Sequence, residues 1–341
     1  MILKPHFFKL LPLLFVSLFF ISCKGLKYNS VYKGYSVEGV HSRGLWAKDS
    51  TIVVSGARGH YSVYNLKGEQ LMLDSMAQIV DFRDVAMFED GSIALVDGSN
   101  NSSFVYVNPD GKKKQVYKRS ATFVDGFDFW DDKNGIAYGD PFNSRFYILT
   151  TENGGSKWRY KSRAKIDLPE KGEAGFAASG TGIQCMGDSA AVFGTGGCTT
   201  PRIFITYNRG DSWEGKSTPM TGGKTSGIYS LYFWSETEGV IIGGDYLQPE
   251  KNDSICFYTS DAGDNWTNIS DGLGGYCSTI QGRSDGRLLV ASGRVGTYYS
   301  LDKGKKWKLL SEDKYYSCQI TDTHIVFSGK NGVLEIIEYQ L

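Results

Sequence analysis

Short runs of apolar, β-branched and aromatic residues alternate with polar, glycine-rich turns along most of this chain. No long segment repeats apolar residues at positions i, i+3 and i+4, so the pattern argues against long helices. Two stretches show the unit clearly, because 127–139 and 231–243 both read as strand, polar turn and strand ending in glycine. The pattern therefore predicts an all-β protein built from short antiparallel strands.

A recurring turn pattern, Ser/Thr-x-Asp/Asn-x-Gly-x-x-Trp, follows four of these strand runs and is here called the Trp box. The four matches run over 151–158, 206–213, 259–266 and 300–307. A short Asp or Asn side chain can bond backbone N–H groups of a turn, Gly accepts a positive φ, and Trp packs the corner onto a sheet. We therefore expect structural roles for Asn153, Trp158, Asn208, Trp213, Asp261, Trp266, Asp302 and Trp307.

Repeats spaced about 40–55 residues apart indicate an array of similar units. The units number seven, and each reads as four antiparallel strands, the blade of a β-propeller. The last unit has strands near 315, 324–327 and 333–339 but no fourth strand of its own. The segment 28–37 can supply that strand and close the ring, which removes the exposed edges of an open array. The predicted fold is a seven-bladed β-propeller closed by an N-terminal strand.

The N-terminal segment has the composition of a signal peptide, because basic residues precede an apolar run from Leu10 to Ile21 that is too short to span a bilayer. The sequence Phe20-Ile21-Ser22-Cys23 is similar to a bacterial lipobox, in which cleavage before Cys23 is followed by lipidation of its thiol. The alternative is an ordinary secretory signal with an incidental cysteine. We expect a signal peptide over 1–22, an anchor linker and possible ring-closing strand over 23–37, and the propeller over 38–341. The expected location is the bacterial periplasm or outer membrane.

The charge composition argues against nucleic acid as a partner, and the cysteine content limits which disulfides can form. Lys and Arg together number 37, as do Asp and Glu, so no excess of positive charge favours nucleic acid. Five cysteines follow Cys23, and an odd count leaves at least one free thiol in a monomer. Cys185 and Cys198 flank a predicted hairpin and are the favoured pair if a disulfide forms, while buried free thiols are the alternative.

With these residues in place, the chain resembles the bacterial, non-photosynthetic branch of the photosystem II assembly/stability factor-like propellers, within the wider group that carries bacterial-neuraminidase (Asp-box) repeats. The Trp boxes carry the wider resemblance. The finer one rests on phrases at 42–45, 55–56, 81–84, 135–141, 172–181, 193–197 and 243–246. The resemblance implies a seven-bladed propeller whose photosynthetic members are non-enzymatic assembly factors. It implies no agreed activity for the other members.

Candidate binding residues follow from the expected blade geometry, in which each innermost strand begins on one face and the loop between strands two and three opens on that face. The expected ligand- or partner-binding residues are Arg43, Arg83, Asp84, Asp140, Glu173, Asp245 and Tyr246, with His41, Arg58, Asp125, Asp128, Ser226, Tyr229, Tyr276, Arg294, Tyr315 and Tyr316 at the same channel mouth. Mixed charges and tyrosines around one concavity suit a polar ligand or a protein loop. The alternative is that these side chains pair with neighbouring blades at a wet channel mouth.

Catalysis is the competing hypothesis. A sialidase-type glycoside hydrolase needs three arginines that grip a carboxylate, an activated tyrosine and an acidic proton donor. Arg43, Arg83 and Arg294 with Glu173 and Asp84 supply these residue types, but the Arg-Ile-Pro signature is absent and Arg202-Ile203-Phe204 is the nearest approach.

Redox and metal chemistry find less support. The glycine-rich stretch 194–197 lies between predicted strands, with no helix N-terminus to hold a phosphate. The four histidines are scattered, so we expect neither cofactor nor metal. The residues favour a monomer that binds an envelope protein, or alternatively a glycan, without catalysis.

Overall fold

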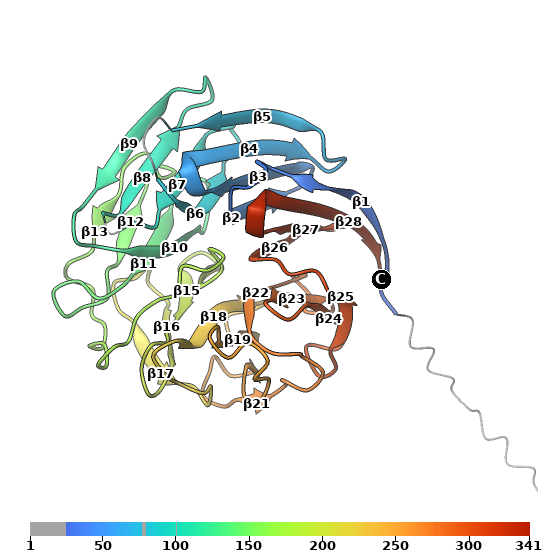
Figure 1. Cartoon of the computed structure of the whole chain (residues 1–341). Coiled ribbons are helices and arrows are strands. Elements are labelled where there is room, and N and C mark those ends of the chain that lie inside the picture. The colour runs from blue at the N-terminus through green and yellow to red at the C-terminus, as the bar shows by residue number, and fades with distance from the viewer. Residues whose placement is uncertain (1–24, 77–79, 100) are drawn as a thin grey trace, which may run out of the picture.

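The computed structural model describes residues 25–76, 80–99 and 101–341, which form a ring of seven four-stranded antiparallel sheets (Figure 1). Blade 1 contains β2 (Ser42–Lys48), β3 (Thr51–Gly56), β4 (His60–Asn65) and β5 (Gln70–Ser75); blade 2 contains β6 (Phe82–Met87), β7 (Ile93–Asp97), β8 (Ser103–Val107) and β9 (Lys113–Lys118); blade 3 contains β10 (Val124–Phe129), β11 (Gly135–Gly139), β12 (Leu149–Thr151) and β13 (Arg159–Tyr160). Blade 4 contains β14 (Ile183–Met186), β15 (Ala190–Gly194), β16 (Arg202–Thr206) and β17 (Glu214–Ser217); blade 5 contains β18 (Ser226–Phe233), β19 (Gly239–Asp245), β20 (Cys256–Thr259) and β21 (Thr267–Asn268); blade 6 contains β22 (Cys277–Gly282), β23 (Leu289–Gly293), β24 (Thr297–Ser300) and β25 (Lys308–Ser311). The predicted all-β propeller with seven blades is confirmed.

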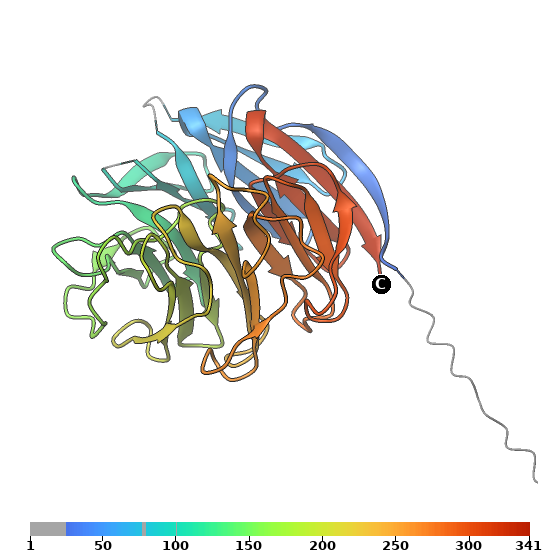
Figure 2. The same ribbon diagram turned by 60° about the horizontal axis from the view of Figure 1, so that its bottom comes forward.

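Blade 7 is assembled from both ends of the described chain. It contains β26 (Ser317–Ile320), β27 (His324–Ser328), β28 (Val333–Gln340) and, as its outermost strand, β1 (Lys27–Tyr35). The register runs from Lys27↔Gln340 to Tyr35↔Val333, and Figure 2 shows β1 lying along β28 at the edge of the ring. The predicted closure by an N-terminal strand is therefore confirmed.

The blades share one orientation, which defines two faces of the ring. The face on which the inner strands β2, β6, β10, β14, β18, β22 and β26 begin is called the upper face, and the face on which they end is called the lower face. Because the strands alternate in direction, the loops between second and third strands lie on the upper face. Two short 3₁₀ turns, η1 (Ala57–Gly59) and η2 (Lys330–Gly332), are such loops.

The apolar core lies between neighbouring blades. One face of each sheet packs on the preceding blade, and the other face packs on the following blade. The second strands are almost entirely buried, and all five residues are buried in each of β7, β11, β15 and β23. They read as nearly continuous apolar or small-residue runs because both of their faces are covered. Two faces buried at every blade give a rigid support for the loops at the channel.

The Trp boxes lie in turns between third and fourth strands, on the lower face. In the second box, Thr206 Oγ1 accepts the Gly210 N–H at 3.1 Å and donates to Asn208 Oδ1 at 3.0 Å. Gly210 has φ +80°, a conformation that favours glycine. In the first box, the Trp158 ring stacks on Phe104 of the preceding blade with centroids 4.3 Å apart. Each box thus closes a turn and packs its blade against the previous one.

The expected signal peptide over 1–22 and the lipidation site Cys23 lie outside the described residues. In the described part of the chain, no helix is long and apolar enough to cross a membrane. Cys185, Cys198, Cys256, Cys277 and Cys318 are all free thiols, so the favoured Cys185–Cys198 disulfide is not formed. Cys256, Cys277 and Cys318 are buried, as the alternative of buried thiols expects.

Candidate functional site

A β-bulge interrupts the inner strand of five blades close to its upper end. The register shifts lie between Ser42 and Gly44, Phe82 and Asp84, Val124 and Gly126, Ile228 and Ser230, and Cys277 and Thr279. The extra residues are Arg43, Arg83, Asp125, Tyr229 and Ser278. A bulge leaves its extra residue outside the ladder and re-aims its side chain. Apart from Asp125, these residues line a common cavity on the upper face.

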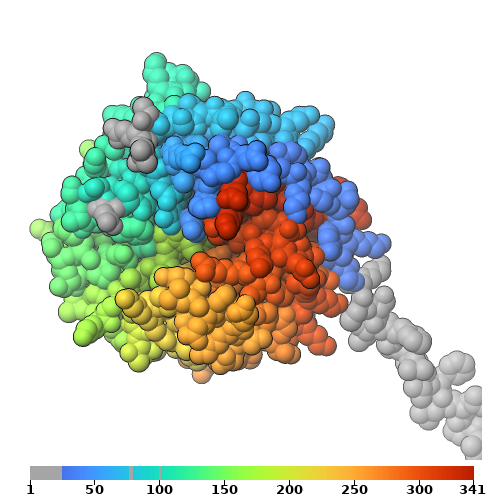
Figure 3. Space-filling view, viewed as in Figure 1, coloured from blue at the N-terminus to red at the C-terminus, as the bar shows by residue number. Residues whose placement is uncertain are grey.

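This upper cavity has a volume of about 760 Å³ and lies at the centre of the ring, which is hollowed in the space-filling view (Figure 3). Its charged lining residues are Arg43, Arg83, Arg294, Lys314, Lys330 and Glu250. Its aromatic lining residues are Phe176, Tyr229, Tyr246, Tyr276, Tyr315 and Tyr316. Five cations face a single carboxylate among these lining residues, although the whole chain carries no net charge. The cavity is therefore positively charged and aromatic.

Two arginines stand side by side on the cavity wall. The Arg83 guanidinium is paired with Asp81, with 2.8 Å between Arg83 Nη2 and Asp81 Oδ2. Arg43 has no ion pair with a described residue, and its guanidinium carbon lies 4.2 Å from the centroid of the Tyr316 ring. Burial, reinforced by the neighbouring Arg83, lowers the pKa of Arg43. An anionic ligand beside Arg43 would relieve this unbalanced positive charge.

The floor of the upper cavity is formed by residues 174–181, which cross the channel before β14 begins and are here called the plug. Arg43 Nη1 and Arg83 Nη1 donate to the carbonyl oxygens of Ala178 and Ala177, each at 3.1 Å. Ser179 Oγ donates to the Ser278 carbonyl at 2.8 Å. The small residues of this segment allow it to pass close to several blades. The phrase 172–181, which carries part of the family resemblance, contains the plug, but nothing in the sequence pattern places this segment inside the channel.

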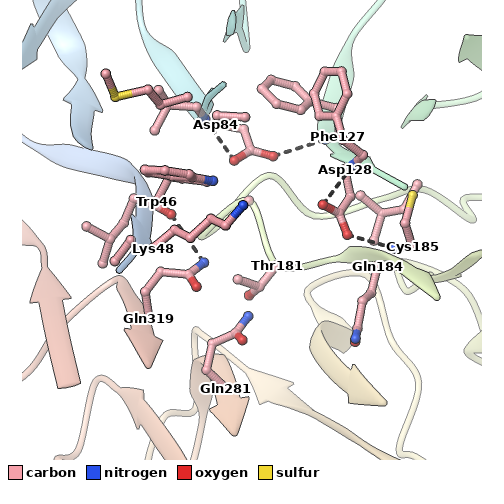
Figure 4. Close-up of a pocket in the computed structure, with 18 of the residues that line it drawn as sticks. Trp46, Lys48, Asp84, Phe127, Asp128, Thr181, Gln184, Cys185, Gln281 and Gln319 are labelled. Carbon is pink, nitrogen blue, oxygen red and sulfur yellow. Dashed lines mark hydrogen bonds between the residues drawn. The ribbon is translucent and has the colours of Figure 1, made fainter. Parts of the chain in front are cut away.

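Beneath the plug lies a second cavity of about 420 Å³, the lower cavity, which Figure 4 shows. It is lined at the ends of the inner strands by Trp46, Lys48, Asp84, Asp128, Gln281 and Gln319, and by Gly180 and Thr181 of the plug. Both aspartates were expected at the upper mouth. Asp84 follows the bulged Arg83 directly, and successive side chains along a strand point in opposite directions. Arg83 therefore lines the upper cavity, whereas Asp84 lines the lower one.

The two aspartates of the lower cavity also stabilise the ring. Asp84 Oδ2 accepts the Phe127 N–H of the next inner strand at 3.0 Å, and Asp128 Oδ2 accepts the Cys185 N–H of the following one at 2.7 Å. These N–H groups lie on the channel edge of a blade, where no further strand can pair with them. Burial raises the pKa of Asp84 well above its usual range and raises the pKa of Asp128 to about 6.

Asp125, which is buried, and Asp140, which is half-buried, form a pair of carboxyl groups beside the plug. The Gly175 N–H donates to Asp140 Oδ1 at 3.2 Å, and a Cβ on Gly175 would lie 2.4 Å from Asp125 Oδ2. Burial and the neighbouring Asp140 raise the pKa of Asp125, and burial raises the pKa of Asp140. Because each of these carboxyl groups affects the titration of the other, the pair favours retention of one proton between them.

Other expected site residues hold loops instead of lining a cavity. The Glu173 side chain is fully buried and accepts from Arg202 Nε at 3.0 Å and from Thr195 Oγ1 at 2.7 Å. Asp245 Oδ1 accepts from Thr225 Oγ1 at 2.8 Å and from the Leu247 N–H at 2.9 Å. These contacts match the alternative in which polar groups at the channel mouth pair with neighbouring segments.

The remaining expected residues fall on the upper side of the ring. Tyr246 lines the upper cavity, and Arg294 Nη1 donates to its carbonyl oxygen at 2.9 Å. His41 packs edge-on against Tyr316, with ring centroids 6.0 Å apart, while Arg58 sits exposed in η1 with φ 59°. Lys314, Lys330 and Phe176 of the upper cavity were missed, as were Lys48 and Gln281 of the lower one. Residues 314, 330 and 176 lie in connecting segments, which periodicity does not place.

Among the described residues, no cluster of three or more His, Cys, Asp or Glu side chains could hold a metal ion. No family model matches the chain, and no curated protein matches it. Solved structures do match. Virginiamycin B lyase from Staphylococcus aureus, as a catalytically inactive variant with quinupristin, is 12% identical, covers 92% of this chain and 99% of its own, and gives a TM-score of 0.64. A selenomethionine-substituted form of that lyase gives a TM-score of 0.63 at 12% identity, with the same coverage.

The computationally designed protein Ika8 is 11% identical, covers 89% of this chain and 98% of its own, and gives a TM-score of 0.57. At such identities these likenesses establish the β-propeller fold alone, because one fold supports many unrelated activities. The resemblance to photosystem II assembly/stability factor-like propellers and to Asp-box proteins gains no support from the comparisons beyond this shared fold.

Proposed function

We propose that this propeller is a non-catalytic binding protein of the bacterial envelope, which holds an anionic segment of a macromolecular partner in its upper cavity. The observation that carries the proposal is the charge of the lining. Arg83 is paired with Asp81, but the other four cations have no ion-pair partner among the described residues, and Glu250 is the single carboxylate among the lining residues. A concave, positively charged site with low-dielectric walls concentrates negative ligands. The volume of about 760 Å³ lies within the range of about 300–1,000 Å³ that is usual for ligand sites.

The cavity also retains hydrogen-bonding capacity. Within the described residues, the Arg43 guanidinium donates only to the Ala178 carbonyl, which leaves further N–H groups for a ligand. The hydroxyl groups of Tyr246, Tyr276 and Tyr316 have no hydrogen-bond partner in the described part of the chain. Tyrosine and arginine are the residue types that dominate binding hot spots, because each joins a large flat surface to polar atoms. A carboxylate-bearing loop of a protein fits this combination.

The alternative of a sialidase-type hydrolase is less well supported. Arg43, Arg83 and Arg294 do meet at the upper cavity, as that hypothesis requires. Its two expected acids do not join them, because Glu173 is bound to Arg202 and Asp84 faces the lower cavity. A proton donor would therefore have to be Glu250, which stands without a second carboxylate among the described lining residues.

The envelope location is part of the proposal and rests on the signal-like segment 1–22 and Cys23. The family resemblance supports the same role, because its photosynthetic members assist assembly without catalysis. The described strand β1 begins at Lys27, so a lipid on Cys23 would leave a short linker between anchor and propeller.

Charge reversal at the rim tests the proposal. Lys314 and Lys330 are exposed, so Lys314→Glu/Lys330→Glu changes the charge of the cavity without disturbing the core. The matched control is Arg287→Glu/Lys305→Glu, which makes the same change in turns of the lower face. The direct probe is a hexaglutamate peptide, titrated calorimetrically at low and high ionic strength, with hexalysine as the negative control. In parallel, the tagged proteins are isolated from cross-linked envelopes of the native host.

We expect hexaglutamate to bind the wild-type protein and the control variant, and to bind the rim variant about tenfold more weakly or not at all. A stoichiometric envelope partner should be lost from the rim variant and kept by the control. Equal peptide binding by all three proteins, or a partner retained by the rim variant, would overturn the proposal.

A further inference from the structure

We propose that the lower cavity is a second ligand site, which takes a neutral, hydroxyl-rich ligand such as a single sugar residue. This second site is additional to the function proposed for the upper cavity, because the plug separates the lower cavity from the upper one. Ala177 and Ala178 line the upper cavity, whereas Ser179, Gly180 and Thr181 line the lower one. The plug is held in place by Thr181 Oγ1, which lies 2.6 Å from Ser230 Oγ, and by the Leu231 N–H, which donates to the Thr181 carbonyl at 3.1 Å.

Three polar groups in the lower cavity have no hydrogen-bond or ion-pair partner among the described residues. They are the Lys48 ammonium, the Gln281 amide and the Trp46 indole N–H. Figure 4 shows Trp46 and Lys48 of β2 in blade 1 facing Gln281 of β22 in blade 6, with the end of Lys48 in the open centre of the cavity. Gln184 offers the contrast, since its amide is satisfied by both backbone groups of Phe233, at 2.8 and 2.7 Å. The unpaired groups therefore remain available to a ligand.

The unpaired groups include both donors and acceptors. Lys48, Trp46 and the Gln281 nitrogen donate, whereas Gln281 Oε1 accepts. Gln319 donates to the Leu45 carbonyl at 3.3 Å, which leaves its Oε1 as another acceptor. A hydroxyl group both donates and accepts, so a ligand with several hydroxyls can satisfy such a mixture more fully than an ion can.

Charge and shape favour the same ligand class. An anion is disfavoured because Asp84 and Asp128 line the cavity together with Asp131 and Asp132, and Lys48 is the single cation among the described lining residues. A cation would meet the Lys48 ammonium at the centre. The Trp46 indole offers a flat apolar face that can pack against the C–H face of a sugar ring. The volume of about 420 Å³ accommodates a small ligand.

Fluorine NMR of protein labelled with 5-fluorotryptophan tests the proposal on the full propeller. The chain has seven tryptophans, and Trp46→Phe assigns the signal from the lower cavity. Trp158 and Trp307, buried between blades, serve as internal references. The probes are D-glucose, D-mannose, N-acetyl-D-glucosamine and D-ribose, each titrated to tens of millimolar.

We expect at least one sugar to shift the Trp46 signal saturably while the reference signals stay in place. Gln281→Leu and Lys48→Met should each raise the dissociation constant about tenfold, the loss expected when one hydrogen bond to the ligand is removed. Arg294→Ala in the upper cavity should leave the dissociation constant of the sugar unchanged. Thermal melting checks that each variant is folded. No saturable shift with any of the four sugars, or equal binding by Gln281→Leu, Lys48→Met and wild type, would overturn the proposal. Loss of hexaglutamate binding alone would overturn only the function proposed for the upper cavity.

Discussion

Asp128 shows how a single half-buried carboxyl group can link two blades. Its Oδ1 accepts the Phe129 N–H at 2.8 Å, and its Oδ2 accepts the Cys185 N–H of the next inner strand. A backbone N–H can only donate, so the position requires an acceptor whether or not the carboxyl group is ionised. Burial raises its pKa to about 6, because the channel offers less solvation to the charge than water does.

The raised pKa of Asp128 predicts how the stability of the fold depends on pH. Between the usual pKa of 3.8 and the folded value of about 6, the folded state binds the proton more tightly than the unfolded state. The contribution of Asp128 to stability is therefore present at low pH and declines as pH rises through this window. We expect the free energy of unfolding of wild type to fall by about 1–3 kcal/mol relative to Asp128→Asn between pH 4 and pH 7. Urea unfolding of both proteins between pH 4 and pH 7 measures this difference. The prediction is wrong if the free energies of unfolding of the two proteins change in parallel with pH.

At the scale of the strand and turn, the Trp boxes make a comparable prediction. Trp158 is 3% exposed and stacks on Phe104, whereas Trp266 occupies the same place in its own box but is only partly buried. We expect Trp158→Ala to lower the free energy of unfolding by about 3–5 kcal/mol, because it leaves a cavity between two blades. Trp266→Ala should cost clearly less. Chemical denaturation of both variants checks the order, and equal losses would show that burial between blades does not set the cost.

These elements also show what the sequence alone could predict. The Trp boxes and the strand–turn–strand phrases mark local structure, and local structure repeated along the chain was enough to predict the blades and their closure. The bulges at Arg43 and Tyr229 were not predictable, because an extra residue in a strand leaves no mark in a pattern that already mixes polar and apolar residues. Arg43, Arg83 and Tyr246 nevertheless line the cavity at which the sequence places them.

The candidate sites were predicted less completely than the fold. Asp84 was expected beside Arg83, but a bulged residue and its neighbour face different cavities. Glu173 was expected to face the channel, yet Arg202 on β16 holds it, and the sequence places these residues far apart. The plug depends on contacts with blades distant in sequence, which periodicity cannot reveal. Burial and side-chain partners therefore had to come from the structure.

At the scale of the whole molecule, the ring depends on the pairing of β1 with β28. Without β1, the backbone groups on the outer edge of β28 would be exposed as a template for another chain. We expect deletion of residues 25–35 to lower the melting temperature and to cause concentration-dependent association, whereas the same protein with β1 stays monomeric. Light scattering across a dilution series measures this, and a monomeric, equally stable deletion variant would contradict it.

The pairing of β1 with β28 also determines when the ring can close during synthesis of the chain. Ser30 donates to Glu335 at 3.0 Å although the two residues are 305 positions apart, so the last blade cannot be completed until both segments have left the ribosome. Six blades can form as their residues emerge, but closure must wait for synthesis of β28. If the chain is exported as proposed, it would lose little by this delay, because the ring would close only after the extended chain has crossed the membrane. On that proposal, the late pairing of β1 with β28 would keep the propeller from completing its fold in the cytosol, where a finished fold would hinder export.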